Sequence, residues 1–116
     1  MNHSTKKFRN IHFVGIGGSG MSGLAEVLIN LGYTVSGSDI SNSAVISRLK
    51  KLGAKIYLKH ESSNISGSEI IVTSSAISHE NKELVKAREN SIPILARAEM
   101  LSSLMNLNPM SLCSLR

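Results

Sequence analysis

The sequence predicts a single α/β domain built on a parallel sheet, and three observations support this prediction. Short β-branched apolar runs alternate with segments whose apolar residues recur at helical spacing, as in strand–helix–strand units. The chain of 116 residues suits one core of ordinary size, and 41% of its residues are hydrophobic. Aromatic residues make up only 3%, so the core is expected to be aliphatic, as in sheets that helices cover on both faces.

The first half of the chain predicts three strands and two helices. Apolar runs predict strands at Ile11–Ile16, Tyr33–Gly37 and Lys55–Leu58. Two helices separate these strands and end near Gly32 and Gly53, since glycine favours the conformation that closes a helix. Their expected inward residues are Met21, Leu24, Ala25, Leu28 and Leu31, then Val45, Ile46, Leu49 and Leu52.

The second half predicts two further strands and two further helices. A turn is expected at Asn64–Ser68, a fourth strand at Glu69–Thr73 and a third helix over Glu80–Asn90. Ile92–Leu95 is expected to be extended, in part because Pro93 disfavours helix at its neighbour. The expected inward residues are Leu84, Val85 and Ala87 in the third helix, and Ala98, Leu101, Leu104 and Met105 in the last.

Strand–helix alternation implies a parallel sheet with right-handed crossovers. The expected strand order is 3-2-1-4-5 in a three-layer domain, with a binding crevice above strands 1 and 4. The crossover between the third and fourth strands is expected to be short or irregular. Residues 1–105 are predicted to form this domain, and residues 106–116, which include a Pro and no acidic residue, a poorly ordered tail.

A glycine loop follows the first predicted strand. Residues 15–20 (GIGGSG) match the G-x-G-x-x-G fingerprint between a strand and a helix, which predicts a Rossmann-like fold that binds a nucleotide diphosphate. Gly15 permits the tight turn, Gly17 allows a diphosphate close to the backbone, and Gly20 allows the helix to lie near the sheet. The positive end of that helix is expected to face the phosphates. The alternative interpretation of the glycine loop is a turn that serves backbone geometry only. Gly23, within the helix that follows, is expected to permit close helix packing.

Asp39 ends the second predicted strand, 19 positions beyond Gly20. Dinucleotide-binding folds place a carboxylate there to hold ribose hydroxyls. This carboxylate would repel a 2′-phosphate, which argues against NADP. The alternative interpretation is an Asp that caps a helix or a turn.

Composition excludes several other classes of protein. The net charge is +5, but the basic residues are scattered and no aromatic residues interleave them, so nucleic acid is not an expected partner. Cys113 is the only cysteine, and no Cys/His group has metal-ligand spacing, so no metal site is expected. The chain has no Gly-Lys pair of a P-loop, and no nucleophile–base pair or close carboxylates, so no catalytic residue is assigned. No signal peptide or membrane span is seen, and a cytoplasmic location is expected.

Five segments together resemble a known family. They are 11–23 (IHFVGIGGSGMSG), 32–33 (GY) with 36–39 (SGSD), 52–57 (LGAKIY) leading to His60, 72–77 (VTSSAI), and 92–93 (IP) with 97–101 (RAEML). In order and spacing they resemble the amino-terminal domain of the Mur ligase family, and in particular its UDP-N-acetylmuramate–L-alanine ligases. Members that add a tripeptide to the same UDP-sugar open with a similar glycine loop, but the runs in the first and fourth segments favour the alanine-adding ligases.

The resemblance implies that this domain binds the UDP part of UDP-N-acetylmuramic acid in peptidoglycan synthesis. The residues expected at the diphosphate are Gly15, Gly17, Gly18, Ser19, Gly20 and Met21. The residues expected near the ribose and uracil, or lining the same crevice, are Ser38, Asp39, His60, Ser74, Ser75 and Ala76.

Plainer interpretations of several of these side chains stay open. His60 is also typical of a surface loop, and Ser74 and Ser75 of a turn. His12, within a strand, is expected to be structural rather than a ligand, and Met100 is expected in the core.

The resemblance further implies that ATP and Mg²⁺ bind only in other domains of a full-length ligase, and that this chain binds no cofactor. The segment after Met105 departs from the family pattern, which indicates a fragment of a longer enzyme or a truncated product such as one of a shifted reading frame. Either would lack the ATP-binding and carboxy-terminal domains. The chain alone is expected to bind nucleotide without ligase activity. The alternatives are an NAD-binding regulatory or redox module, and an inactive remnant of a Mur ligase.

Overall fold

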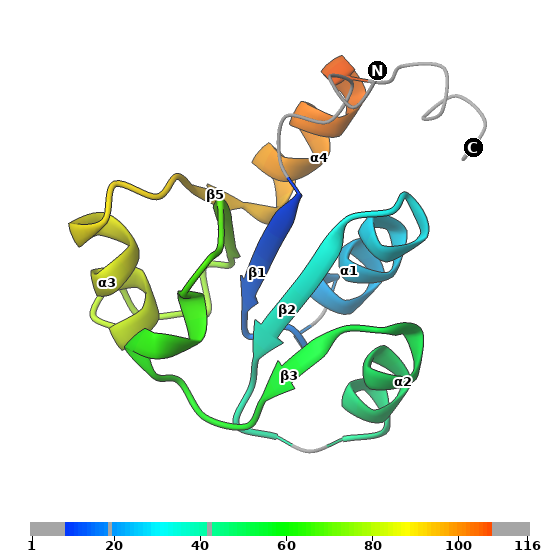
Figure 1. The fold of residues 1–116 in the computed structure, drawn as a ribbon, viewed down its shortest axis with the longest axis horizontal. Coiled ribbons are helices and arrows are strands. Elements are labelled where there is room, and N and C mark those ends of the chain that lie inside the picture. Colours follow the sequence, from blue (N-terminus) through cyan, green and yellow to red (C-terminus); the bar gives the residue numbers. More distant parts are fainter. Residues whose placement is uncertain (1–8, 19, 42, 108–116) are drawn as a thin grey trace.

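The computed structural model describes residues 9–18, 20–41 and 43–107 of the chain. Five parallel strands form one sheet in the order β3-β2-β1-β4-β5, which confirms the predicted α/β class and strand order (Figure 1). The elements are β1 (Asn10–Val14), α1 (Met21–Asn30), β2 (Thr34–Ser38), α2 (Ala44–Leu52), β3 (Lys55–Tyr57), the 3₁₀ helix η2 (Ser62–Ile65), β4 (Ile70–Thr73), α3 (Lys82–Glu89), β5 (Ile94–Ala96) and α4 (Arg97–Leu107).

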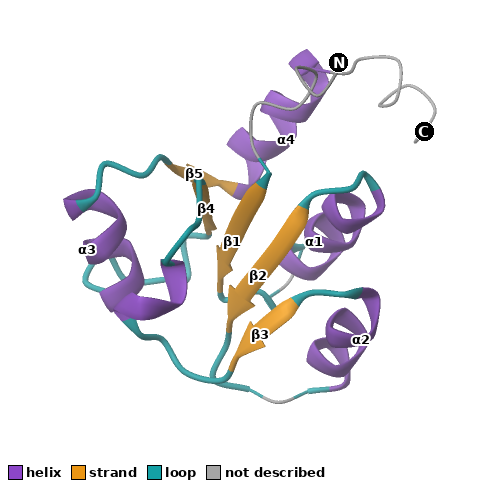
Figure 2. Cartoon of the chain, in the orientation of Figure 1, coloured by secondary structure: helices purple, strands orange, loops and turns teal. Residues whose placement is uncertain are grey.

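Helices cover both faces of the sheet, with α1 and α2 on one side and α3 on the other (Figure 2). Ile11 and Phe13 of β1 pack in a core cluster with buried side chains of α1, α2 and α4. Val14 packs in a second cluster with Ile65 of η2 and with Leu84 and Ala87 of α3. Successive strand residues point to opposite faces, so the polar residues of β1 and β2 at alternate positions are directed toward α3.

Six residues that the periodicity predicted to point inward are not fully buried: Leu31, Val45, Leu52, Val85, Ala98 and Leu101. Leu31 is 40% exposed because it caps α1 beyond its last turn, and Val45 and Leu52 of α2 are each 38% exposed. Because α2 covers the short edge strand β3, only one narrow stripe of that helix reaches the core. Val85 is partly buried, and Ala98 is exposed in the first turn of α4.

Other residues predicted in the last helix have different outcomes. Met100 is buried in the first core cluster, as expected, and Leu101 packs partly against it. The side chains of Leu104 and Met105 lie outside those that the structure describes. Helix α4 extends through Leu107, two residues into the segment predicted as a tail, and residues 108–116 lie outside the described part of the chain.

The crossover between β3 and β4 is short and irregular, as predicted, but it is not a simple turn. The 3₁₀ helix η2 occupies its centre, and its Asn64 is buried rather than exposed in a turn. The side-chain amide of Asn64 donates to the carbonyl of Lys59 at 2.8 Å and to the carboxylate of Glu83 at 2.7 Å. These two contacts explain why a polar residue is buried here.

Two glycines differ sharply in the space around them. A Cβ built on Gly37 of β2 would lie 2.5 Å from Cδ1 of Ile16 and 2.6 Å from its Cβ, so the backbone of β2 needs glycine at this point. A Cβ on Gly23 would meet nothing within 4 Å among the described residues. The expectation that Gly23 permits close helix packing is therefore wrong, because this face of α1 is open.

These surroundings predict opposite effects of alanine at the two positions. Gly37→Ala is expected to lower the free energy of unfolding by about 1–3 kcal/mol, because the added methyl group overpacks the contact with Ile16. Gly23→Ala serves as the matched control and is expected to raise it by up to about 1 kcal/mol, since alanine is the better helix former. Urea unfolding followed by circular dichroism measures both changes. A Gly37→Ala protein as stable as the unchanged chain would contradict this packing.

Candidate functional site

The glycine loop, residues 15–20, begins where the carboxyl ends of β1 and β2 meet. Gly15 has a φ of +80°, a left-handed conformation that favours glycine. The N–H groups of Gly15 and Ile16 both donate to the carbonyl of Ser38, at 2.8 and 3.0 Å. The loop therefore makes the tight turn expected of it and is fixed to the end of the neighbouring strand.

The loop ends at the start of α1. The N–H of Gly18 donates to the carbonyl of Gly15, and the N–H of Met21 donates to the carbonyl of Gly18, both at 3.0 Å. Gly20 is the N-cap of α1, with a φ of +78°, and Ser19 lies outside the described residues. The positive end of the α1 dipole therefore lies at the loop, as the fingerprint predicted.

The carboxylate of Asp39 lies between the glycine loop and the turn that follows β2. Its Oδ2 accepts from the N–H of Gly17, and its Oδ1 accepts from the N–H of Ser41, both at 2.9 Å. A Cβ on Gly17 would lie 2.9 Å from Oδ2, so a side chain at this position would force the carboxylate of Asp39 to shift. The bond to Ser41 is the turn role considered for Asp39 from the sequence. A phosphate that approached the N–H of Gly17 would compete with this carboxylate.

Arg97, the first residue of α4, also contacts the glycine loop, and the sequence reasoning did not select it as a site residue. A Cβ built on Gly20 would lie 2.9 Å from Nε of Arg97. Within the described part of the chain Arg97 has no ion pair, and the nearby Glu99 accepts instead from the N–H of Ala96 at 2.7 Å. An unpaired cation beside the positive end of a helix favours a bound anion. The sequence feature that could have identified Arg97 is its position as a basic residue directly after the fifth strand.

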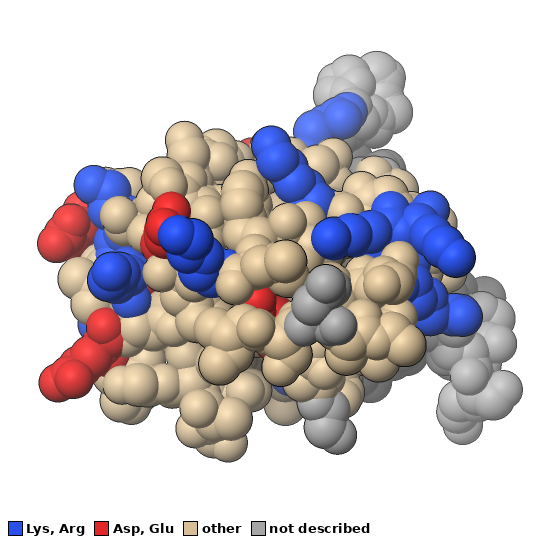
Figure 3. All heavy atoms as spheres, turned by 90° about the horizontal axis from the view of Figure 1, so that it is seen from below, with Lys and Arg blue, Asp and Glu red and all other residues tan. Residues whose placement is uncertain are grey.

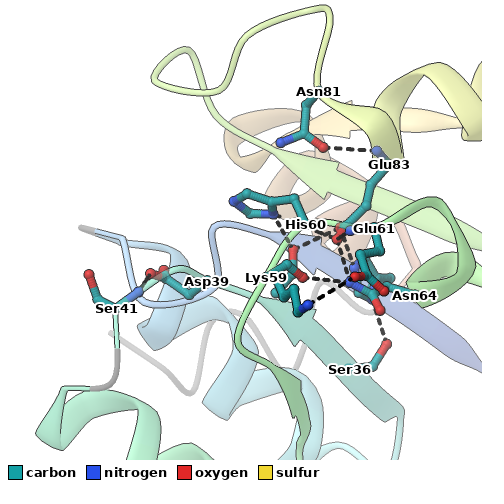
Figure 4. A network of polar contacts seen from close by, with 11 residues as sticks. Ser36, Asp39, Ser41, Lys59, His60, Glu61, Asn64, Asn81 and Glu83 are labelled. Atoms are coloured by element: carbon teal, nitrogen blue, oxygen red, sulfur yellow. Dashed lines mark hydrogen bonds and ion pairs between the residues drawn. The ribbon is translucent and has the colours of Figure 1, made fainter.

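A buried polar network joins four elements near the same end of the sheet (Figure 4). Its centre is Glu83 of α3, which has no exposed surface. Oε1 of Glu83 accepts from Nε2 of His12 at 2.8 Å and from the hydroxyl of Ser38 at 2.7 Å. Oε2 accepts from the side-chain amide of Asn64 at 2.7 Å and from the N–H of Glu61 at 3.1 Å. This one carboxylate therefore connects α3 with β1, β2 and the η2 segment.

The surroundings of Glu83 favour its charged form. Burial raises the pKa of a carboxyl group, but the hydrogen bonds from His12, Asn64 and Ser38 outweigh burial here and hold the pKa of Glu83 below its ordinary value. The sequence reasoning missed this residue, although Glu83 lies on the same helical stripe as Leu84 and Ala87.

His12 has the structural position that the sequence predicted for it. It is fully buried, and its Nδ1 lies 2.8 Å from the hydroxyl oxygen of Ser36 while its Nε2 bonds to Glu83. Both ring nitrogens therefore have protein partners.

His60 and Ser38, which were expected near the ribose and uracil, lie side by side. Nδ1 of His60 is 2.8 Å from the hydroxyl oxygen of Ser38 and 3.6 Å from Oε2 of Glu83. The side chain of His60 is 22% exposed, whereas Ser38 is fully buried behind it. In Figure 4 the His60 ring lies on the side of the network nearer Asp39. Of this pair, His60 is the residue that a ligand can reach.

The segment 74–76 follows β4 and lies beside the glycine loop. It forms a turn in which the N–H of Ile77 donates to the carbonyl of Ser74 at 3.1 Å. Cδ1 of Ile77 would lie 3.0 Å from a Cβ on Gly15, so the turn reaches the start of the loop. At the end of β4, the hydroxyl oxygen of Thr73 is buried and has no hydrogen-bond partner within the described residues.

Charge is not concentrated at the centre of this end of the molecule. Figure 3 views the chain from the end at which the strands finish, and its central part is mostly uncharged. Lys and Arg gather on the side of α1 and α2, and on the opposite side they alternate with Asp and Glu (Figure 3). Among residues 9–18, 20–41 and 43–107, no group of three or more His, Cys, Asp or Glu could hold a metal ion. In the same residues no helix is long and apolar enough to cross a membrane.

A glycine loop between the first strand and helix, with a carboxylate directly after the second strand, is the arrangement of a Rossmann-like domain. The model of the Mur ligase family, catalytic domain, matches residues 10–108, and the chain belongs to the Mur ligase family.

The resemblance to the alanine-adding members is confirmed. The chain is 59% identical over 101 residues to the UDP-N-acetylmuramate--L-alanine ligases of Koribacter versatilis and Herminiimonas arsenicoxydans, which covers 87% of this chain and 22% of each relative. The chain thus spans about a fifth of the length of these relatives.

Solved structures of the family share the fold. The UDP-N-acetylmuramate-alanine ligase of Thermotoga maritima superposes with a TM-score of 0.79 at 34% identity, over 84% of this chain and 23% of that one. The UDP-N-acetylmuramate:L-alanyl-gamma-D-glutamyl-meso-diaminopimelate ligase of Neisseria meningitides superposes with a TM-score of 0.73 at 26% identity, over 83% of this chain and 31% of that one.

The network around Glu83 predicts a specific loss of stability in acid. Because its pKa in the folded chain lies below the ordinary value of 4.5, ionised Glu83 stabilises the fold above pH 4.5, and this contribution is lost as the pH falls through the lower, folded value. Glu83→Gln is expected to cost about 1–3 kcal/mol at neutral pH, since a charged acceptor is lost. It is also expected to reduce the decline in the free energy of unfolding between about pH 6 and pH 3.

Denaturant unfolding at a series of pH values measures this effect. Glu80→Gln, which changes an exposed carboxylate just before α3, is the matched control and is expected to keep the slope of the unchanged chain. Equal slopes in the Glu83→Gln and Glu80→Gln proteins would show that Glu83 is not held ionised by its neighbours.

Proposed function

We propose that the chain binds the UDP part of UDP-N-acetylmuramic acid, as the amino-terminal domain of a ligase that adds L-alanine in peptidoglycan synthesis. The observation that carries the proposal is the position of the glycine loop at the start of α1, at the same end of the sheet as Asp39 and His60. Rossmann-like folds bind nucleotides at this place. The 59% identity to UDP-N-acetylmuramate--L-alanine ligases favours a UDP-sugar over other nucleotides.

In this proposal the glycine loop and the first turn of α1 hold the diphosphate. The contributing residues are Gly15, Gly17, Gly18, Ser19, Gly20 and Met21. Gly17 presents backbone without a side chain, and the diphosphate takes over the N–H that Asp39 accepts from in the unliganded chain. Arg97 adds positive charge next to Gly20, where the two negative phosphates would otherwise meet only the partial charge of the helix.

The nucleoside occupies the neighbouring part of the same end of the sheet. Asp39, once the diphosphate has replaced it at Gly17, accepts from the ribose hydroxyls. His60 contacts the nucleoside, with Ser38 behind it, and Ser74, Ser75 and Ala76 line the side toward β4. The buried, unpartnered hydroxyl of Thr73 supports a polar ligand or a water molecule near this side.

In the longer ligase this domain supplies binding energy remote from the reacting carboxylate. Such energy raises the rate by holding the reacting group in place in the neighbouring domains. The sequence has no Gly-Lys pair of a P-loop, and its described residues hold no metal-ligand group, so these residues do not fit ATP or Mg²⁺. We assign ATP and Mg²⁺ to the other domains, and we expect the chain alone to bind the UDP-sugar without joining alanine to it.

An NAD-binding module is the second candidate, because a carboxylate at the position of Asp39 is shared by NAD-binding domains. Thermal unfolding separates the two. UDP-N-acetylmuramate at a free concentration 100 times its Kd adds about 2.7 kcal/mol of stability. For a domain of this size that raises the Tm by about 10 °C. NADH at the same concentration is expected to leave the Tm unchanged, and the opposite pattern would reject the proposal in favour of the NAD-binding module.

A variant of Arg97 is the control for the position of the diphosphate. Arg97→Ala is expected to leave the Tm of the unliganded chain nearly unchanged, since Arg97 is exposed and has no ion pair within the described residues. It is expected to reduce the ligand-induced shift, because it removes a cation beside the glycine loop. An undiminished shift would place the diphosphate away from Gly20.

A further inference from the structure

We propose that Glu83 acts through Ser38 to hold the proton of His60 on Nδ1, so that Nε2 of His60 accepts a hydrogen bond from the N3–H of uracil. Glu83 and Ser38 are then positioning residues, and the network selects uracil against cytosine. This inference rests on the proposed function, because it requires a uridine nucleotide at this end of the sheet.

Four hydrogen-bond donors surround the carboxylate of Glu83. Each of its oxygens accepts two hydrogen bonds, from His12 and Ser38 at Oε1 and from Asn64 and Glu61 at Oε2. A carboxylate has no hydrogen to donate and about four lone-pair positions, so it is saturated by these contacts. Each partner must therefore direct a hydrogen at Glu83.

The hydroxyl group of Ser38 has a single hydrogen to donate. That hydrogen is directed at Oε1 of Glu83, 2.7 Å away. The hydroxyl oxygen can then only accept in its 2.8 Å contact with Nδ1 of His60. His60 therefore carries its hydrogen on Nδ1, and in the neutral ring Nε2 is left as an acceptor.

Nε2 of His60 is open to a ligand. Within the described residues no hydrogen bond to Nε2 of His60 is found, and the side chain is 22% exposed. The ring lies on the side of the network nearer Asp39, the carboxylate that we assign to the ribose (Figure 4). A nucleoside bound at Asp39 is therefore placed to meet His60.

An acceptor at Nε2 selects a group that can only donate a hydrogen bond. A ribose hydroxyl both donates and accepts, so it would bond to either form of the ring. The N3 atom of uracil carries a hydrogen and only donates, whereas the N3 atom of cytosine only accepts. A His60 ring whose proton is held on Nδ1 therefore binds uracil in preference to cytosine. With cytosine, Nε2 and the N3 atom would be two acceptors facing each other, and burying them without a donor costs more free energy than the loss of one ordinary hydrogen bond.

Glu83→Gln is expected to reverse the arrangement while the network stays satisfied. The backbone N–H of Glu61 can only donate, so the new side-chain oxygen stays on that side and the new NH₂ group faces His12 and Ser38. Ser38 then accepts from the amide and turns its hydrogen toward Nδ1 of His60. The ring proton moves to Nε2, which becomes a donor.

Calorimetric titration of the chain with UDP, CDP and 2′-deoxy-UDP tests this inference. The unchanged chain is expected to bind UDP at least about tenfold more tightly than CDP. Glu83→Gln is expected to remove the preference for UDP over CDP or to reverse it. Ser38→Ala, which removes the acceptor at Nδ1, is expected to bring the affinities for UDP and CDP within about threefold of each other. Ser36→Ala is the matched control, because Ser36 bonds to His12 and not to His60, and it is expected to keep the preference for UDP.

The outcomes separate this inference from the proposed function. No binding of UDP or UDP-N-acetylmuramate by the unchanged chain would overturn both. Binding of UDP with an equal affinity for CDP, discrimination against 2′-deoxy-UDP alone, or a preference for UDP that survives in both Glu83→Gln and Ser38→Ala would overturn the inference and leave the proposed function standing. Should Ser38→Ala fail to fold, the Glu83→Gln ratio alone decides the question.

Discussion

The buried carboxylate of Glu83 is the constraint on which the arrangement of this end of the sheet depends. A charge taken out of water needs hydrogen-bond donors on every side, and here the donors come from β1, β2 and the segment around η2. Helix α3 therefore cannot shift along the sheet without leaving a buried charge without hydrogen-bond donors, which is strongly destabilising. The apolar cluster around Leu84 and Ala87 covers the face, but the polar network fixes the register.

The glycine loop owes its shape to the protein before any ligand is considered. The carbonyl of Ser38 receives two N–H groups of the loop, and Asp39 receives a third from Gly17. Ser38 at the end of β2 and Asp39 directly after it thus shape the loop, and Ser38 also belongs to the buried network through its hydroxyl. The loop and the network are therefore connected through Ser38, and a diphosphate that displaces Asp39 exchanges one anion for another at the same N–H. The nearby guanidinium of Arg97 makes that exchange more favourable.

The strand order and the position of the glycine loop could be predicted from the sequence, because both follow from short-range patterns and the handedness of crossovers. The buried faces of the helices were predicted less well, as the exposed Val45 and Leu52 show. The periodicity of apolar residues does not reveal how wide a part of the sheet a helix covers. The network could not be predicted, because Glu83 bonds to residues 19 to 71 positions away, and only its place on an apolar stripe hinted at burial. Ser38 and His60 were selected by resemblance, whereas their mutual contact and the tautomer it implies required coordinates.

The position of one hydrogen tests this account most directly. Long-range ¹H–¹⁵N correlation spectra of the unliganded chain at neutral pH report, for each histidine ring, which nitrogen is protonated, and loss of signals in a His60→Gln protein assigns His60 among the four histidines. We expect a protonated Nδ1 and a bare Nε2 in His60. A ring with its hydrogen on Nε2 would mean that Ser38 donates to His60 rather than to Glu83, and it would contradict the central role given to the carboxylate.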